Sequence, residues 1–254
     1  MKLTILKLMT LFILALTVHS RGGERVGNGG GGLFCKDQRQ NILLDYYEGM
    51  QSGYTYHLIN SMNDSQRVEL FDYRIRYHIP ELADILKKMR KFFHKRKQYL
   101  ANADFKIPDD FGDVSIPRNC ELKVTMVQRP SLVNGENIFF INRSLYQKLP
   151  KVSQNGMINH ELLYFISLAN SDLNSQKTRK ALAYLMSDQY DFNSDTFNEK
   201  FLKLIDPSLD GYIEDRDTDG LSDYADSIFP LETFWLWLCS DLESRGFSCP
   251  RHVY

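Results

Sequence analysis

The chain has 254 residues, of which 43% are apolar, so it is long enough to bury one large core or two small ones. Its 31 basic and 32 acidic side chains leave a net charge of -1, which excludes a global attraction to nucleic acid or to an anionic membrane. Any such binding must come from a local patch.

Residues 1–20 have the pattern of a secretory signal peptide. Lys2 and Lys7 give the positively charged start, and an uncharged apolar run then ends at Val18. That run is short for a membrane span, although an N-terminal anchor helix is the alternative interpretation. We expect cleavage before Arg21, hence an exported protein, periplasmic or secreted, whose mature chain has no transmembrane span.

The residues after the signal peptide divide into three parts. Residues 21–32 are rich in glycine and are expected to form a flexible lead-in. Order is predicted to begin at Leu33, where a main helical α+β domain starts and runs to residue 190. Residues 191–254 are expected to form a lobe with a calcium loop and a C-terminal helix.

Four cysteines are present, namely Cys35, Cys120, Cys239 and Cys249. An even count in an exported chain favours two disulfides, and three pairings exist. The short separation of Cys239 and Cys249 favours a local bridge, which leaves Cys35 with Cys120. A four-cysteine metal site is the alternative, but no C-x-x-C pair supports it.

The pattern from Pro80 to Leu100 predicts a long helix with one buried face. Its apolar stripe comprises Leu82, Ile85, Leu86, Met89, Phe92 and Phe93. Its other face is basic, with Lys87, Lys88, Arg90, Lys91, Lys95, Arg96 and Lys97. This face is either a docking surface for an anionic partner or a solvated surface, and we favour the solvated surface. No aromatic platform is interleaved with these side chains, so there is no strong nucleic-acid signal.

Apolar and polar residues alternate over 120–128, which predicts one strand with a wet face. Its buried side chains would be Leu122, Val124 and Met126. A turn at Asn134-Gly135 and a returning strand at 138–141 predict an antiparallel hairpin that leads into a central helix.

The central helix is predicted over residues 155–169, with one buried face. That face comprises Met157, Ile158, Leu162, Phe165, Ile166 and Ala169. Turn-forming residues at 170–174 precede a second helix that starts near Ser175. Together these elements predict an α+β fold, mainly helical with a small antiparallel β-hairpin or sheet.

His160, Glu161 and Tyr164 in the central helix resemble part of the helical zinc-protease motif. In that motif two histidines four residues apart bind zinc and the glutamate activates water. Tyr164 stands where the second histidine should be, and a phenol is a poor zinc ligand. A third ligand would have to come from His57, His78, His94, His252 or a carboxylate. The alternative is that His160 and Glu161 make buried hydrogen bonds to groups such as Arg179.

Five short blocks of the sequence resemble a group of exported proteins from predatory bacteria that has no assigned activity. The blocks are G-G-L-F-C at 31–35, L-L-D-Y-Y-E at 43–48, I-P-R-N-C at 116–120, H-E-L-L-Y at 160–164 and N-S-Q-K-T-R at 174–179. The resemblance covers most of residues 31–187 and implies that His160, Glu161 and Tyr164 share a site or a scaffold with the last block. In that group an arginine often follows the tyrosine, whereas Phe165 follows here.

Residues 215–226 give the strongest chemical signal in the chain. Carboxylates at loop positions 1, 3, 5, 9 and 12, a glycine at position 6 and a backbone carbonyl at position 7 supply oxygen ligands for Ca²⁺. The ligands would be Asp215, Asp217, Asp219, Leu221, Asp223 and Asp226, with Gly220 at the turn. The loop resembles the thrombospondin type 3 calcium repeat of secreted proteins. An acidic surface turn is the alternative.

Residues 231–244 after this loop predict a helix that carries Phe234, Trp235, Leu238 and Leu242. The sequence as a whole favours an exported, calcium-binding, disulfide-bonded globular protein that acts by binding or as a structural factor. The alternative is a zinc-dependent hydrolase with a degenerate HExxY motif at His160 and Glu161.

Overall fold

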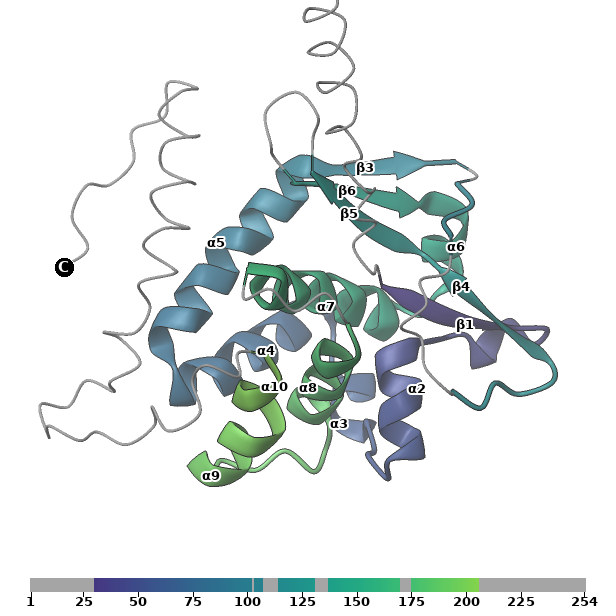
Figure 1. Ribbon diagram of the computed structural model, residues 1–254. Coiled ribbons are helices and arrows are strands. Elements are labelled where there is room, and N and C mark those ends of the chain that lie inside the picture. The colour runs from purple at the N-terminus through teal and green to yellow at the C-terminus, as the bar shows by residue number, and fades with distance from the viewer. Residues whose placement is uncertain (1–29, 102, 107–113, 131–136, 170–174, 206–254) are drawn as a thin grey trace, which may run out of the picture.

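The computed structural model describes residues 30–101, 103–106, 114–130, 137–169 and 175–205. Helices predominate in these ranges and two small sheets lie beside them, which confirms the predicted α+β fold (Figure 1). The helices are α2 (Leu44–Gln51), α3 (His57–Ser61), α4 (Asp64–His78), α5 (Pro80–Arg96), α6 (Arg143–Lys148), α7 (Lys151–Ala169), α8 (Gln176–Met186), α9 (Ser194–Phe197) and α10 (Lys203–Ile205), with a 3-10 turn η1 (Gln38–Gln40) and a π-helical turn η3 (Asn198–Leu202). None of these described helices is long and apolar enough to cross a membrane.

Each of the two sheets has three strands. The first has the order β2-β1-β4 and is antiparallel throughout, with strands β1 (Gly31–Cys35), β2 (Ile42–Leu43) and β4 (Cys120–Val124). The second has the order β3-β6-β5, with strands β3 (Lys97–Leu100), β5 (Met126–Pro130) and β6 (Asn137–Asn142). β5 and β6 are antiparallel and confirm the predicted hairpin, whereas β3 runs parallel to β6.

The prediction of one strand over 120–128 is wrong, because the structure divides this segment at Thr125. The Thr125 amide donates a hydrogen bond to the Gly30 carbonyl, and the Thr125 carbonyl accepts one from the Asn142 amide, each at 2.9 Å. β4 therefore pairs with β1, whereas β5 pairs with β6. Thr125 joins the two sheets.

The division at Thr125 also changes which apolar groups the side chains contact. Val124 lies in a small apolar cluster, and so does Val127, three residues later. Met126, predicted to share the face of Val124, lies in the main core instead. A strict alternation would place Val124 and Met126 together, so the side-chain pattern shifts by one residue at the break.

Helix α7 runs through the middle of the molecule, with α4, α5, α8 and α10 against it (Figure 1). The prediction of a single buried face is too narrow, because Leu163 and Tyr164 are buried as well as Met157 and Leu162. Gly156 lets β2 and α2 approach closely, since a Cβ there would lie 2.7 Å from Leu43 Cδ2. Because α7 is covered on most of its surface, it buries polar residues as well as apolar ones.

The long helix predicted from Pro80 ends at Arg96, four residues before its predicted end, and the chain continues as β3. The helix ends there because residues 97–100 form a strand that pairs with β6, a contact between segments far apart in the sequence. The predicted apolar stripe is confirmed, with Phe92 half-buried and the remaining members buried. Arg90, which was predicted to lie on the basic face, is instead half-buried and binds Asp72 and Asn159.

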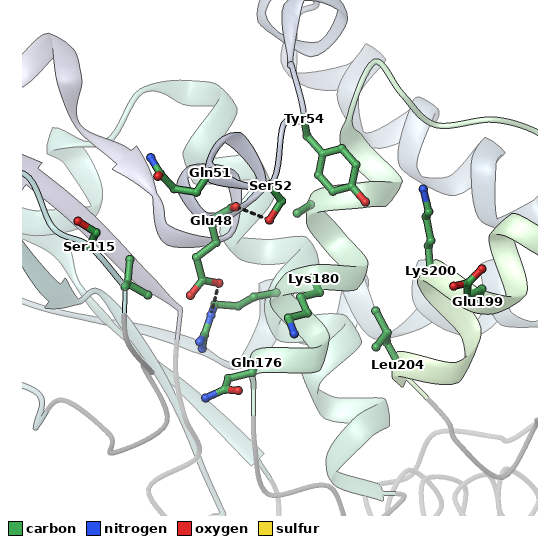
Figure 2. A pocket seen from close by; sticks show the side chains of 14 residues that line it. Glu48, Gln51, Ser52, Tyr54, Ser115, Gln176, Lys180, Glu199, Lys200 and Leu204 are labelled. Atoms are coloured by element: carbon green, nitrogen blue, oxygen red, sulfur yellow. Dashed lines mark hydrogen bonds and ion pairs between the residues drawn. The ribbon is translucent and has the colours of Figure 1, made fainter.

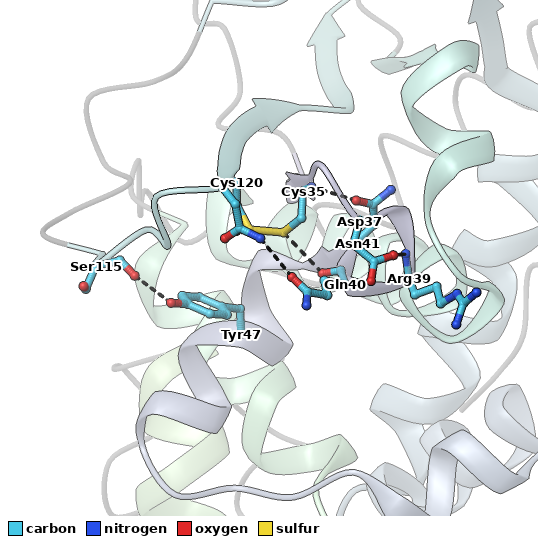
Figure 3. Close-up of a disulfide and its surroundings, with 9 residues drawn as sticks. Cys35, Asp37, Arg39, Gln40, Asn41, Tyr47, Ser115 and Cys120 are labelled. Atoms are coloured by element: carbon cyan, nitrogen blue, oxygen red, sulfur yellow. Dashed lines mark hydrogen bonds between the residues drawn. A yellow bond between two sulfur atoms is a disulfide. The ribbon is translucent and has the colours of Figure 1, made fainter.

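A disulfide joins Cys35 and Cys120, which lie opposite each other in the β1–β4 pair (Figure 3). This confirms one bridge of the expected pairing; Cys239 and Cys249 lie outside the described residues. Beside it, the Cys35 amide donates to Asn41 Oδ1 at 2.8 Å, and the Tyr47 hydroxyl donates to the Ser115 carbonyl at 2.6 Å. The bridge and the Tyr47 contact together hold the segment before β4 against α2.

We expect the double variant Cys35→Ser with Cys120→Ser to lose about 2–4 kcal/mol of its free energy of unfolding. The bridge closes a sequence separation of 85 residues, so its removal increases the entropy of the unfolded chain. Urea denaturation of the full chain measures the change. Each single variant should lose about as much as the double variant, because either one removes the bridge. Wild-type stability in all three variants would contradict a structural role.

Candidate functional site

The predicted functional residues fall into two groups. The calcium residues Asp215, Asp217, Asp219, Leu221, Asp223 and Asp226, and the C-terminal helix, lie outside the described residues. His160 and Glu161 lie on α7 within the described residues. Their solvent-exposed fractions are 1% and 0%. The geometry around these two residues therefore defines the candidate site.

His160 is paired with a carboxylate that sequence analysis did not single out. His160 Nδ1 lies 2.7 Å from Asp45 Oδ2, and both side chains are buried. Asp45 stands in the first turn of α2, where the helix dipole favours negative charge. Burial disfavours the charged imidazole, but the Asp45 carboxylate outweighs this effect and raises the pKa of His160. The proton on Nδ1 is thus held between α2 and α7.

Glu161 binds the first described residue of the chain. The Gly30 amide donates to Glu161 Oε1 at 2.6 Å, and the Gln128 side-chain amide donates to the Glu161 carbonyl oxygen at 2.7 Å. Burial raises the pKa of Glu161 to about 7. The position requires glycine, since a Cβ at Gly30 would lie 2.8 Å from Met157 Cγ. Gly30 to Gly32 therefore belong to the fold, which begins ahead of the predicted start at Leu33.

A second ion pair lies one turn further along α2. Glu48 Oε2 accepts a hydrogen bond from Arg179 Nε at 2.7 Å, and Arg179 Nη1 donates to Ser175 Oγ at 2.8 Å. Arg179 is only 2% exposed. Burial raises the pKa of Glu48, and the pair with Arg179 offsets this only in part. The hydrogen bond expected between Arg179 and His160 or Glu161 is replaced by this pair with Glu48.

Five side chains thus form a polar cluster between α2, α7 and α8, in which Asp45, His160, Glu161 and Arg179 are buried and Glu48 is half-buried. A buried charge is tolerated only when it is paired. The cluster satisfies this rule through two pairs, Asp45 with His160 and Glu48 with Arg179. It holds three helices and the start of β1 in one arrangement.

Among the described residues, no second histidine is grouped with His160 as a possible metal ligand, as the zinc-protease interpretation requires. Tyr164 is buried, with its ring centre 6.0 Å from that of His160. His78 instead contacts the Tyr190 hydroxyl at 3.0 Å, and His94 lies 3.1 Å from Lys97 Nζ. In the part of the chain that the structure describes, no group of three or more His, Cys, Asp or Glu side chains is placed to hold a metal ion. His252 lies outside that part.

Two atoms of the motif nevertheless have no hydrogen-bond partner among the described residues. They are His160 Nε2 and Glu161 Oε2, both fully enclosed. The arrangement with a carboxylate on Nδ1 and an open Nε2 is common in metal-binding histidines. A histidine with a purely structural role, paired with the buried Asp45 carboxylate, would have the same arrangement.

A pocket of about 570 Å³ opens beside the cluster (Figure 2). It is lined by Glu48, Gly49, Gln51, Ser52 and Tyr54 from α2 and its following turn, Val114 and Ser115 before β4, Gln176, Arg179, Lys180 and Ala183 from α8, and Glu199, Lys200 and Leu204 from η3 and α10. The Glu48–Arg179 pair forms part of its wall. His160 and Glu161 do not line the pocket, so the cluster meets it only through that pair.

Sequence analysis missed Asp45, Glu48 and the pocket. One signal was present, because Asp45 and Glu48 lie three residues apart and so share one face of a helix. Asp45 also lies between Leu44 and Tyr46, both of which are buried. An acidic residue in such a run indicates a buried partner, but the sequence does not say that this partner is His160.

The contribution of Glu161 and His160 to the stability of the protein should fall as the pH rises from about 5 to 8, whereas His78 and His94, whose pKa values burial lowers, act in the opposite direction. Both Glu161 and His160 have raised pKa values, so the folded state binds more protons than the unfolded state. For Glu161 the loss runs from its ordinary value, 4.5, to about 7, at up to about 1.4 kcal/mol per pH unit. Above about 6.5, His160 adds to the loss until its own raised pKa is passed.

The variant Glu161→Gln tests this pH dependence by urea denaturation. It should lose less stability than the wild type between pH 5 and 7, because its side chain does not ionise. Glu121→Gln is the matched control, since Lys123 lowers the pKa of that exposed carboxylate and places its titration below the range measured. A wild-type slope in Glu161→Gln would show that Glu161 is ionised throughout.

Comparison of the chain with protein-family models, with curated proteins and with solved structures gave no match.

Proposed function

We propose that this chain is an exported, calcium-binding protein whose α+β domain acts by binding a small charged ligand. Three observations support the proposal: the secretory pattern of residues 1–20, the Cys35–Cys120 disulfide and the acidic loop at 215–226. Disulfides persist in oxidising compartments, which agrees with export. The single observation that carries the binding role is the pocket beside the Glu48–Arg179 pair.

The chemistry of the pocket selects a ligand with charges of both signs. Glu48 and Arg179 neutralise each other, which leaves Glu199 as the negative group and Lys180 and Lys200 as the positive groups of the lining. A pocket of about 570 Å³ lies in the usual range for small-molecule sites. An amino acid or a dipeptide fits both criteria, since it carries an ammonium and a carboxylate group at neutral pH. We propose this class as the ligand.

The wall of the pocket is held in place before any ligand arrives. Glu48 is fixed by Arg179, and Arg179 is fixed by Ser175. The Ser115 carbonyl accepts a hydrogen bond from the hydroxyl of Tyr47, the neighbour of Glu48 on α2. A preorganised site loses less entropy on binding than one that must order itself.

The position of His160 and Glu161 favours binding over catalysis at this pocket. A general base must come within hydrogen-bond distance of the proton that it abstracts. His160 and Glu161 are enclosed and do not line the pocket. In the proposed protein they are scaffold residues that position Glu48 and Arg179 through α2 and α8.

A zinc-dependent hydrolase is the second candidate. The observation that favours it is the unpartnered Nε2 of His160, with Nδ1 held by Asp45. A metal inventory of the purified full chain discriminates between the two candidates. Stoichiometric zinc that disappears in His160→Ala would replace the binding proposal with the hydrolase; calcium alone would not.

We expect zwitterionic dipeptides to raise the melting temperature of the full chain, with Lys180→Glu greatly reducing the effect. At a concentration a hundredfold above the dissociation constant, a ligand that binds only the folded state adds about 2.7 kcal/mol to its stability. Lys180 lies in the pocket and is exposed, so its replacement should not disturb folding. Differential scanning fluorimetry with lysyl-glutamate as the probe measures the shift.

The matched control for the pocket is Lys177→Glu, which makes the same charge change on α8 outside the pocket. It should keep the wild-type response to the dipeptide. The same peptide acetylated at its amino groups and amidated at its carboxyls should give no shift. Equal responses of wild type and Lys180→Glu, or no response to a panel of dipeptides, would contradict the proposed ligand class.

Calcium at about 10 mM should raise the free energy of unfolding by about 1.4 to 2.7 kcal/mol. This range follows from the expected dissociation constant, on the order of 10⁻⁴ to 10⁻³ M, which is typical of extracellular calcium modules. We expect this weak affinity because the Asp226 side chain is shorter than the usual glutamate. Asp217→Ala should abolish the effect, whereas Asp104→Ala, at an exposed position outside the loop, should keep it. If calcium leaves the wild type unchanged, the loop is only an acidic turn.

A further inference from the structure

The lining of the pocket has an excess of positive charge. The Glu48–Arg179 pair is neutral, and the remaining charged groups of the lining are Lys180, Glu199 and Lys200, all of them exposed. Within the part of the chain that the structure describes, no ion pair joins these three side chains to one another or to a further group. Two ammonium groups thus stand against one carboxylate in the lining.

Lys180 belongs to the face of α8 that forms one wall of the pocket (Figure 2). Gln176, Lys180 and Ala183 line the pocket from this helix. They are separated by four and three residues, so they share one side of α8. In the proposed function, the Lys180 ammonium binds the terminal carboxylate that every amino acid or dipeptide carries.

Lys200 reaches the same pocket from a different element. It stands in η3, a π-helical turn, and π-helical turns often occur at functional sites. Lys200 Nζ lies 5.5 Å from the centre of the Tyr184 ring on α8, which is a cation–π contact. An aromatic ring attracts the ammonium group without neutralising its charge. Lys200 therefore presents a positioned positive charge in addition to that of Lys180.

The pocket also has an apolar part, formed by Gly49, Val114, Ala183 and Leu204. An aliphatic side chain gains free energy when such a surface removes it from water. A volume of about 570 Å³ has room for an aliphatic side chain as well as a charged one. A free acidic amino acid would leave this part of the lining unfilled.

Given the binding function proposed above, we infer that Lys200 makes the pocket selective for a dipeptide of one aliphatic and one acidic residue. At neutral pH such a ligand has one ammonium and two carboxylate groups, the reverse of the one glutamate and two lysines of the lining. Glu199 pairs with the ammonium group, Lys180 with the terminal carboxylate and Lys200 with the side-chain carboxylate. A dipeptide with an uncharged side chain leaves Lys200 without an anion.

Isothermal titration calorimetry of the full chain with leucyl-glutamate and leucyl-glutamine tests this inference, because the two peptides differ in charge but hardly in shape. We expect the wild type to bind leucyl-glutamate about fivefold more tightly, the effect of one partly exposed ion pair. The preference should vanish at about 1 M NaCl, where the screening length is about 3 Å. Free glutamate, which lacks the aliphatic group, should bind roughly tenfold more weakly than leucyl-glutamate.

The variant Lys200→Gln supplies the decisive comparison. Its ratio of affinities for the two peptides should fall to about one, because the charge that selects the second carboxylate is gone. The control Lys148→Gln removes an exposed lysine of α6 outside the pocket and should keep the wild-type ratio.

Three results would overturn the inference and leave the proposed function standing. They are equal affinities of the wild type for the two peptides, a fivefold preference that persists in Lys200→Gln, and free glutamate that binds as tightly as leucyl-glutamate. If neither peptide binds the wild type, the proposed function fails and the inference fails with it.

Discussion

The contact between Asp45 and His160 is the constraint on which the rest of the structure depends. It joins α2 to α7 at 2.7 Å in a place that water does not reach. Removing one member of such a pair leaves an uncompensated buried charge, at a cost of about 3–5 kcal/mol. One turn along α2, Glu48 repeats the arrangement with Arg179 of α8. The two carboxylates of this short helix therefore fix the positions of α7 and α8.

These buried pairs also determine where the pocket lies. Glu48 belongs to the cluster and to the pocket wall, so the same side chain has a structural role and, in the proposed function, a binding role. His160 and Glu161 lie behind it on α7, where they contact Asp45 of α2 and Gly30 just before β1. His160 and Glu161, which resemble part of a catalytic motif, thus lie behind the pocket, whereas residues without any motif line it.

The sequence predicted those elements whose pattern is local. The stripe of α5 and the succession of α7 and α8 follow from apolar residues at three- and four-residue spacing. The disulfide followed from cysteine count and export. The division at Thr125 and the end of α5 at Arg96 could not be predicted, because hydrogen bonds to β1 and β6 decide them. Long-range pairing overrides local preference at both positions.

The buried cluster was hidden from sequence analysis for a related reason. Periodicity counts Asp45 and Glu161 as polar and assigns them to solvent, although both are buried. Gly30 resembles a linker residue in composition, yet its lack of a side chain is what admits Glu161 and Met157. In each case the deciding partner lies more than a hundred residues away in the chain.

A double-mutant cycle on Asp45 and His160 tests the central claim most directly. Asp45→Asn removes the charge and His160→Phe replaces the imidazole by an apolar ring; the free energies of unfolding of both single variants and of the double variant are measured. We expect each single variant to be strongly destabilised and the double variant to lose less than their sum, by more than about 1 kcal/mol. Losses that add within about 0.5 kcal/mol would show that the two residues act independently, and would contradict this expectation.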